Sequence, residues 1–160
     1  MSSFSIRVDL SMLEEALRRD AVACQEAARP AAQAGAQVLY DEVVRNVSRI
    51  KRHTGNLASS IYQAYSSAKS SPGVATYHVS WNARKAPHGH LVEYGHLQRY
   101  EVSYDSKTRR FTTHKNKPLA LPRQVAARPF VRPAAAKMPQ AEQAMRERLL
   151  AELSAAGVTK

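Results

Sequence analysis

A helical repeat of apolar residues, running from residue 11 to about residue 51, constrains this chain more than any other feature. Apolar and small side chains recur at three- and four-residue spacing, which places them on one face of an α-helix. Ser11, with Glu14 three residues later, forms a capping box that predicts where the helix begins. The repeat consists of Leu13, Leu17, Ala21, Cys24, Ala28, Ala31, Ala34, Val38, Val43, Val47 and Ile50.

Two features of this helix bear on its shape and packing. Pro30 lacks a backbone N–H and clashes with the preceding turn, so we expect a kink or an interruption there. The small residues at 31–36, which include Gly35, allow a second helix to approach closely. Cys24 lies on the apolar stripe and is interpreted as a small buried hydrophobe.

The rest of the chain alternates short strand patterns with turns and ends in a second helix. The buried stripe of that last helix is expected to be Met138, Ala141, Met145, Leu149 and either Leu150 or Leu153. The expected elements are a strand at 4–10, a helical turn and strand at 57–65, a loop at 66–73, a strand at 74–81, a helical turn at 91–94, a hairpin at 100–113, a long loop at 114–127 and a helix at 133–156.

Strand patterns that lie between two helices favour the α+β class. We therefore expect a long, kinked N-terminal helix, a mainly antiparallel sheet of about four strands, and a C-terminal helix. The 160 residues fit one domain. Its parts are a helix at 11–51, a sheet with basic loops at 54–127, and a proline-rich strap followed by a helix at 128–157.

Composition and cysteine usage limit the class of protein. The single cysteine excludes an internal disulfide framework and fits synthesis in a reducing cytoplasm. The N-terminus lacks the apolar run of a signal peptide, and no stretch approaches the roughly 18 apolar residues of a membrane span. A soluble protein with no membrane partner is expected.

Positive charge is concentrated in the middle of the chain. The net charge is +11, and residues 51–135 hold fourteen Lys/Arg against three acidic residues. Such a surface attracts either a phosphate backbone or an acidic protein partner. Seven aromatic residues interleave with these cations, which leaves a non-specific nucleic-acid-binding module as an alternative function. They are Tyr62, Tyr65, Tyr77, Trp81, Tyr94, Tyr100 and Tyr104.

Catalytic patterns are weak. His88, His90, Glu93 and His96 have the chemistry of zinc ligands, and a metal-dependent hydrolase is therefore a further alternative. Their spacing matches no established metal motif, and the glycines and proline around them are typical of a loop. We find no GxSxG elbow and no phosphate-binding glycine loop. No catalytic residue, no metal ligand and no cofactor is therefore expected.

The segment ARPFVRPA at 127–134 is interpreted as a docking element. Proline fixes its own φ and favours extended geometry in the residue before it, so Arg128-Pro129 and Arg132-Pro133 should form a stiff extended strap. Pro133 also suits the first position of the helix that follows. Phe130 would anchor the strap in an apolar pocket. Glu93 is interpreted as a buried ion-pair residue whose partner is Arg84, Arg99 or an arginine of the strap.

Three sequence motifs, taken together in their order along the chain, resemble those of a family of long-tailed bacteriophage morphogenesis proteins. These are the tail-component or tail-completion proteins of the head–tail connector. The three motifs are TGNLASSI at 54–61, APHGHLVEYGH at 86–96 and ARPFVRPA at 127–134, within a resemblance that spans about residues 10–155. The family pattern often has Thr where this chain has His96, and the basic insert at 97–123 is longer than the minimal version. The residues assigned a structural or docking role are Gly55, Leu57, Glu93, Tyr94, Gly95, Arg128, Pro129, Phe130, Arg132 and Pro133.

The resemblance implies a structural, non-enzymatic virion protein of a phage or prophage, made in the bacterial host cytoplasm. It implies a ring at the neck, with hexamers expected, that completes the tail or joins it to the head. The implied partners are further copies of the chain and other neck and tail proteins. The basic region would line a lumen that DNA crosses or would face an acidic neck protein.

Overall fold

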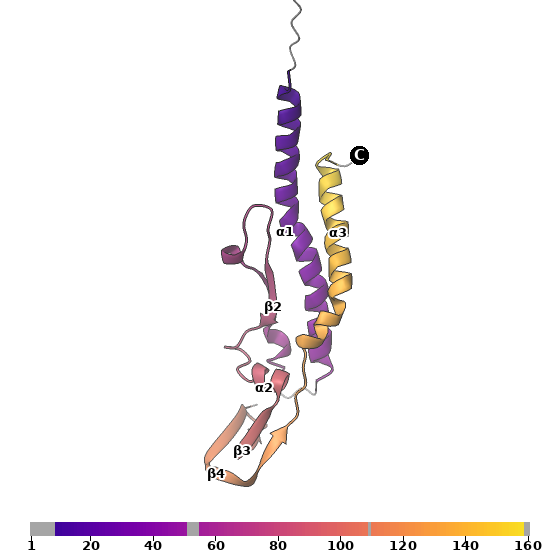
Figure 1. Cartoon of the computed structure of the whole chain (residues 1–160). Helices are drawn as coiled ribbons and strands as arrows, with labels where there is room; N and C mark the ends of the chain where they lie inside the picture. Colours follow the sequence, from indigo (N-terminus) through magenta and orange to yellow (C-terminus); the bar gives the residue numbers. More distant parts are fainter. Residues whose placement is uncertain (1–8, 51–54, 109, 159–160) are drawn as a thin grey trace, which may run out of the picture.

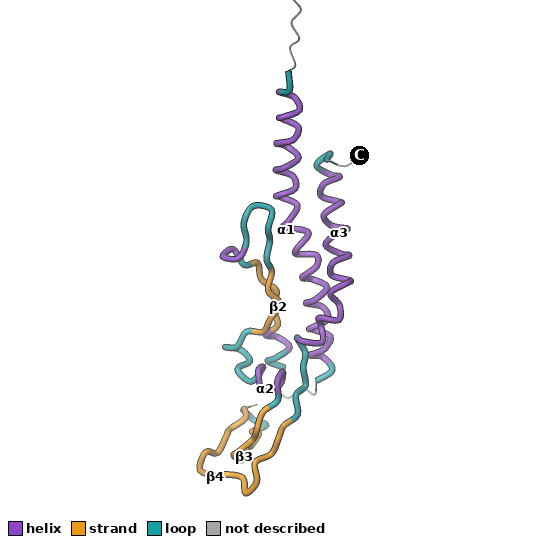
Figure 2. The backbone as a smooth tube through the Cα atoms, viewed as in Figure 1, coloured by secondary structure: helices purple, strands orange, loops and turns teal. Residues whose placement is uncertain are grey.

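The fold is an elongated helix pair with two β-hairpins attached along and below it (Figure 1). The computed structural model describes residues 9–50, 55–108 and 110–158. In chain order the elements are α1 Ser11–Ser48, η1 Ala58–Ser60, β1 Ile61–Tyr65, η2 Ser67–Lys69, β2 Tyr77–Trp81, α2 Gly89–Tyr94, β3 His96–Asp105, β4 Arg110–Val125, η3 Arg132–Lys137 and α3 Met138–Ala155, where η marks a 3₁₀ helix. Figure 2 shows the helices and strands together with the loops that connect them. The α+β class is confirmed.

The long N-terminal helix is one continuous α-helix that includes Pro30. The prediction that the helix is interrupted at this proline was therefore wrong, whereas a kink at Pro30 remains a prediction. The capping box was also wrong, because Leu10 occupies the N-cap position without a side-chain cap. The Asp9 carboxylate accepts a hydrogen bond from the Ser11 N–H at 3.0 Å instead. The strand expected at 4–10 falls mostly on residues 1–8, outside the described residues.

The expected close helix approach is confirmed, with α3 as the partner. Ala31, Gly35 and Ala36 of α1 are buried, as is Ala141 of α3. A Cβ placed on Gly35 would lie 2.5 Å from Met145 Cγ and 3.1 Å from the Ala141 carbonyl oxygen. The small residues therefore set the distance between the two helices, which run side by side in Figure 1.

The strands form two separate two-stranded antiparallel sheets, which corrects the single sheet expected from the sequence. In the first sheet β1 pairs with β2, from Ile61 opposite Trp81 to Tyr65 opposite Tyr77. The Tyr65 and Tyr77 rings meet edge to face at 5.5 Å, as cross-strand aromatic pairs do. The Arg29 guanidinium lies 4.4 Å from the centre of the Tyr65 ring and ties this hairpin to α1.

The second sheet is a long hairpin of β3 and β4, which we call the arm (residues 96–125). The hairpin prediction at 100–113 is confirmed, but the loop expected at 114–127 was wrong because β4 continues to Val125. The register shifts twice, since Gln98 pairs with Arg123, Tyr100 with Pro118 and Glu101 with His114. The longer β4 strand therefore bulges, and these bulges hide the two-residue alternation that marks a regular strand.

The apolar core lies at the C-terminal end of α1, where several short elements converge. Phe130 and Ala86 are fully buried there, and the Trp81 ring meets the Phe130 ring edge to face at 5.5 Å. The core cluster comprises Val43, Val47, Leu57, Ile61, Ala86, Phe130 and Ala134. Gly55 has φ +79° in the turn that leads to Leu57.

The opposite end of the helix pair is poorly covered. Cys24 is exposed, which overturns its interpretation as a buried residue. On α3, Met138 is exposed and Ala141 is buried, and of the two alternatives expected at the end of the stripe Leu153 is half-buried whereas Leu150 is exposed. Cys24 is exposed because the first half of α1 extends beyond the end of α3, and a helical repeat does not reveal where the partner helix ends. Within the described residues, no helix is long and apolar enough to cross a membrane.

Candidate functional site: the Glu93 clamp

Helix α2 positions Glu93, and glycines at both ends of this helix fix its place. A Cβ on Gly89 would overlap the indole ring of Trp81. At the other end Gly95 has φ +72°, and a Cβ there would lie 2.6 Å from the Val125 carbonyl oxygen. Helix α2 packs so closely on β2 at Gly89 and on the end of the arm at Gly95 that a larger residue does not fit at either glycine.

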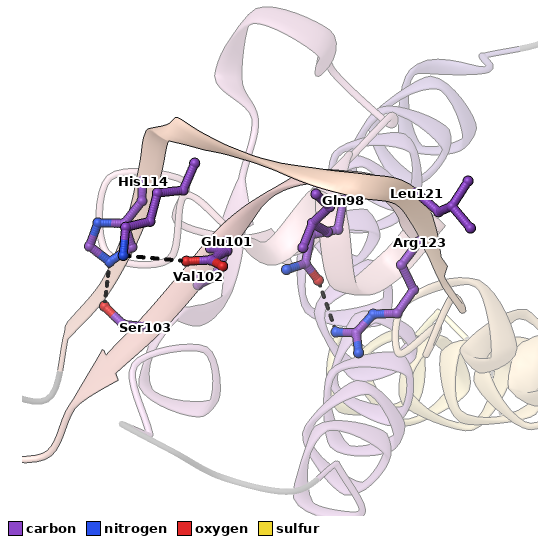
Figure 3. Close-up of a pocket in the computed structure, with 9 residues that line it drawn as sticks. Gln98, Glu101, Val102, Ser103, His114, Leu121 and Arg123 are labelled. Atoms are coloured by element: carbon purple, nitrogen blue, oxygen red, sulfur yellow. Dashed lines mark hydrogen bonds and ion pairs between the residues drawn. The ribbon is translucent and has the colours of Figure 1, made fainter.

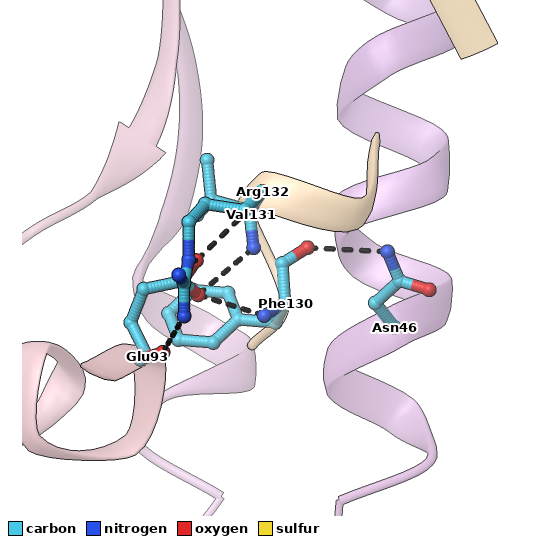
Figure 4. A network of polar contacts seen from close by, with 5 residues as sticks. All are labelled: Asn46, Glu93, Phe130, Val131 and Arg132. Atoms are coloured by element: carbon cyan, nitrogen blue, oxygen red, sulfur yellow. Dashed lines mark hydrogen bonds and ion pairs between the residues drawn. The ribbon is translucent and has the colours of Figure 1, made fainter. Parts of the chain in front are cut away.

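The Glu93 carboxylate is 1% exposed and holds the segment 130–132 by hydrogen bonds. Its Oε2 accepts from the backbone N–H groups of Phe130 at 2.7 Å and Val131 at 3.0 Å. Its Oε1 accepts from the Arg132 backbone N–H at 3.0 Å and from Arg132 Nε at 3.1 Å. The Arg132 Nη2 group donates to the Glu93 carbonyl oxygen at 2.7 Å, which closes a ring of contacts (Figure 4). We call this arrangement the Glu93 clamp.

These hydrogen bonds determine the ionisation of Glu93. Burial acts to raise its pKa, because it removes water from the charged form. The three backbone N–H donors and the Arg132 side chain outweigh burial, so the net pKa lies below its ordinary value. Glu93 is therefore a buried anion whose oxygens are already occupied by hydrogen bonds, which suits a structural tie rather than proton transfer.

Phe130 closes the other side of the clamp. Its side chain is fully buried, and its carbonyl oxygen accepts from Asn46 Nδ2 at 3.1 Å (Figure 4). Asn46 thereby links the segment to α1, a role that the sequence analysis missed. The sequence did contain a signal for this role, because Asn46 is a polar residue that lies between Val43 and Val47 on the buried face of the helix. Such a residue needs a hydrogen-bond partner in the core.

The structure also places the other strap residues and corrects part of the strap's geometry. Arg132 is the clamp partner of Glu93 and lies 4.9 Å from the centre of the Tyr94 ring. Arg128 bonds through its backbone, donating to the Val92 carbonyl oxygen at 2.8 Å, and its side chain is exposed. The extended geometry expected at Arg132-Pro133 was wrong, because both residues begin the 3₁₀ helix η3. Pro133 nevertheless occupies the start of a helix, as its fixed φ favours.

The histidines do not assemble with Glu93 into a metal site. Among the described residues, no group of three or more His, Cys, Asp or Glu side chains is placed to hold a metal ion. Burial and the neighbouring His90 lower the pKa of His88, which favours its neutral form. His96 Nδ1 is buried without a partner at the start of β3. Both oxygens of the Glu93 carboxylate are engaged in the clamp rather than directed towards these histidines.

A second polar cluster lies on the arm, where β3 and β4 bulge apart (Figure 3). Ser103 Oγ and His114 Nε2 lie 2.8 Å apart, and Arg123 donates to Gln98 Oε1 at 2.9 Å. Lys117 pairs with Glu101 at 3.7 Å, with both side chains more than half exposed. Leu121, also on this bulge, is 84% exposed. These contacts connect the two strands on an open surface.

A comparison with known protein families identifies the family to which this chain belongs. Residues 12–95, just over half of the chain, match the family model HK97-gp10_like, described as "Bacteriophage HK97-gp10, putative tail-component". The chain belongs to the HK97-gp10-like family. The expected resemblance to phage tail proteins is thereby confirmed. No curated protein and no solved structure matches the chain.

The HK97-gp10-like match relates directly to the clamp. It runs from α1 through α2 and ends at Gly95, so it includes Glu93 but not the strap to which Glu93 is bonded. The strap, the arm and α3 lie outside the matched residues. In this HK97-gp10-like chain, the clamp therefore connects the matched region to the C-terminal part of the protein.

Proposed function

We propose that the chain is a structural, non-enzymatic protein of the phage neck. Copies form a ring, with six expected, that completes the end of the tail and joins it to the head. Membership of a phage tail-component family is the observation that carries the proposal. The roles of the strap and of Gly55, Leu57, Tyr94, Gly95 and Pro129 are then to support a rigid subunit that docks against neighbouring parts of the virion.

The exposed surface of the chain supports a role in an assembly. Its accessible surface is 12233 Å². A compact monomer of 17.7 kDa is expected to expose about 8,000 Å². The subunit therefore exposes about half as much surface again as a self-contained protein of its size. Obligate assemblies cover such surface with partner subunits.

The experiment is a deletion of the gene in the phage or prophage that encodes it. After induction, electron microscopy should show filled heads and separate tails, and supply of the chain in trans should restore joined particles. Complete, infectious particles from the deletion strain would refute the neck role. A catalytic protein of phage metabolism would instead lower particle yield without separating heads from tails.

A second candidate function is non-specific contact with nucleic acid, either in the lumen of the ring or outside a particle. The arm favours it, because residues 96–125 hold seven Lys/Arg against two acidic residues. The same arm exposes parts of Tyr100, Tyr104 and Phe111, whose rings can stack on bases. Fluorescence anisotropy with a DNA duplex across a salt series tests it. Tight binding by the free chain that weakens steeply with salt supports this candidate.

A further inference from the structure

The first half of α1 carries an apolar stripe that nothing in the described structure covers. Leu13 and Leu17 are 55% and 61% exposed, Leu10 at the N-cap is 54% exposed, and Ala21 and Cys24 are exposed. At 100° per residue all five lie on one side of the helix. We call Leu10, Leu13, Leu17, Ala21 and Cys24 the N-terminal stripe. An apolar helix face of this kind marks a contact surface.

A groove of complementary character lies at the other end of the molecule. It has a volume of about 660 Å³ and separates the arm from the body. The body, by which we mean the part of the fold outside the arm, supplies apolar side chains from the end of α1, from the η1 region and from α2. The arm supplies Val102 and Phe111. We call it the arm groove; its apolar body residues are Val47, Ile50, Leu57, Ala58, Leu91 and Val92. Amphipathic helices bind in grooves lined in this way.

A copy cannot place its own stripe in its own groove. Both surfaces are attached to α1, which is one continuous helix. Leu17 and Val47 are thirty residues apart on it, a separation of about 45 Å at 1.5 Å per residue. Figure 1 shows the free end of α1 and the arm at opposite ends of the fold. A contact between the two surfaces therefore requires a second copy.

The charges around the two surfaces are opposite. Residues 9–28 hold five acidic residues and two arginines, a net charge of −3, and Glu14 and Asp20 flank the stripe. The arm, residues 96–125, has seven Lys/Arg and two acids, a net charge of +5. Lys85 and Arg110 line the groove itself. Such complementarity favours this pairing over the contact of two basic arms.

We propose that the N-terminal stripe of one copy binds in the arm groove of the next copy. The contact joins two different surfaces, so it is heterologous, and repetition around an axis closes a ring. The inference rests on the proposed ring function and specifies the interface that builds it. The apolar stripe supplies the buried contact, and the acidic flanks set its register on the basic arm.

A cross-linking experiment locates the contact. One full-length population keeps Cys24 as its only cysteine, and a second carries Cys24→Ser with Val102→Cys. A short bismaleimide added to the mixture should produce a covalent heterodimer between Cys24 and residue 102. In the matched control the second population carries Cys24→Ser with Ser154→Cys, which should give little heterodimer. Equal yields in the two mixtures, or no heterodimer with residue 102, would overturn the proposal.

A pair of matched leucine variants tests the stripe by function. Leu17→Lys adds a positive charge to the stripe, whereas Leu150→Lys adds one to an exposed site on α3 with similar exposure, 52% against 61%. Both variants should keep the circular dichroism of the wild type, which shows that each subunit still folds. Analytical ultracentrifugation at high protein concentration should show that Leu17→Lys alone loses the oligomer. Retained oligomers in Leu17→Lys would contradict the proposal.

These results separate the interface from the proposed function. Rings that persist in Leu17→Lys, together with separated heads and tails in the deletion strain, would refute the stripe contact and keep the neck role. A chain that stays monomeric at millimolar concentration would refute the self-contact. A stripe cross-linked to a different neck protein would assign the stripe to that partner and also overturn the proposal.

Discussion

At the scale of single residues, Glu93 and Asn46 together link three parts of the molecule that are distant in sequence. Its carboxylate holds the backbone of residues 130–132, and Asn46 holds the same segment from α1. A buried charge is costly unless it is paired and hydrogen-bonded, and here four donors meet that requirement. We therefore expect the fold to depend on an anion at this position rather than on a neutral polar residue.

Replacement of Glu93 by glutamine tests this dependence. The amide keeps the shape but turns an NH₂ group towards backbone N–H donors, so we expect a loss of about 3 kcal/mol in the free energy of unfolding. Urea unfolding monitored by Trp81 fluorescence measures it. Glu101→Gln is the control, because Glu101 is exposed and its salt bridge to Lys117 is long at 3.7 Å. A loss below that of the control would contradict the clamp.

The same variant should change the dependence of stability on pH. The pKa of Glu93 is lowered in the folded state, so below about pH 4.3 the unfolded chain takes up a proton first. The stability that Glu93 contributes is thus present above its unfolded pKa and lost as the pH falls through its folded pKa. Unfolding measured from pH 6 to pH 3 should show a shallower decline in Glu93→Gln. Parallel profiles would show that another carboxylate is responsible.

Phe130 tests the apolar side of the clamp. Its ring is fully buried against Trp81, so Phe130→Ala leaves a cavity and should cost about 3–5 kcal/mol. Thermal unfolding measures the change. Phe111→Ala is the matched control, because its ring is 53% exposed and its truncation should cost much less. An unchanged melting temperature in Phe130→Ala would argue against the anchor role.

At the scale of elements, the contact between α1 and α3 depends on the lack of a side chain at Gly35. Gly35→Leu should separate the helices and cost about 1–3 kcal/mol, as overpacked cores do. Met145 can move aside, but the Ala141 carbonyl oxygen belongs to the α3 backbone and cannot. Val22→Leu, at an exposed site on the same helix outside the N-terminal stripe, is the control and should leave the unfolding free energy almost unchanged. Equal stability of the two variants would contradict this packing.

Local patterns predicted the elements better than they predicted the partners of those elements. The helical repeat located α1, the small residues at 31–36 its contact with α3, and the hairpin pattern the tip of the arm. The burial of Cys24 and the single sheet were wrong, because periodicity specifies a face and not what covers it. The candidate partners expected for Glu93 were Arg84, Arg99 and the two arginines of the strap, and Arg132 of the strap is the one found. Asn46 and the three backbone donors were missed, since backbone groups carry no sequence signal.

At the scale of the whole molecule, the distribution of the core explains the shape. The buried cluster lies around the end of α1, between α2 and the strap, and the first half of α1 and the arm project from it in opposite directions. A two-stranded ribbon alone is only marginally stable in water. An exposed helix stripe and an exposed ribbon on one subunit are therefore surfaces that assembly would stabilise.

Solution scattering tests this shape for the isolated subunit. A compact domain of 160 residues has a radius of gyration of about 15 Å. The 38-residue helix α1 alone is about 57 Å long, so the monomer should give a clearly larger value. The Leu17→Lys variant is the suitable sample, because it is expected to stay monomeric, and Leu150→Lys reports the assembled form. Circular dichroism must show that the variant is folded, because an unfolded chain would also scatter as an extended particle. A folded monomer with a radius near 15 Å would mean that the arm and the end of α1 pack back onto their own subunit. The surfaces proposed to join neighbouring copies would then be covered within each copy.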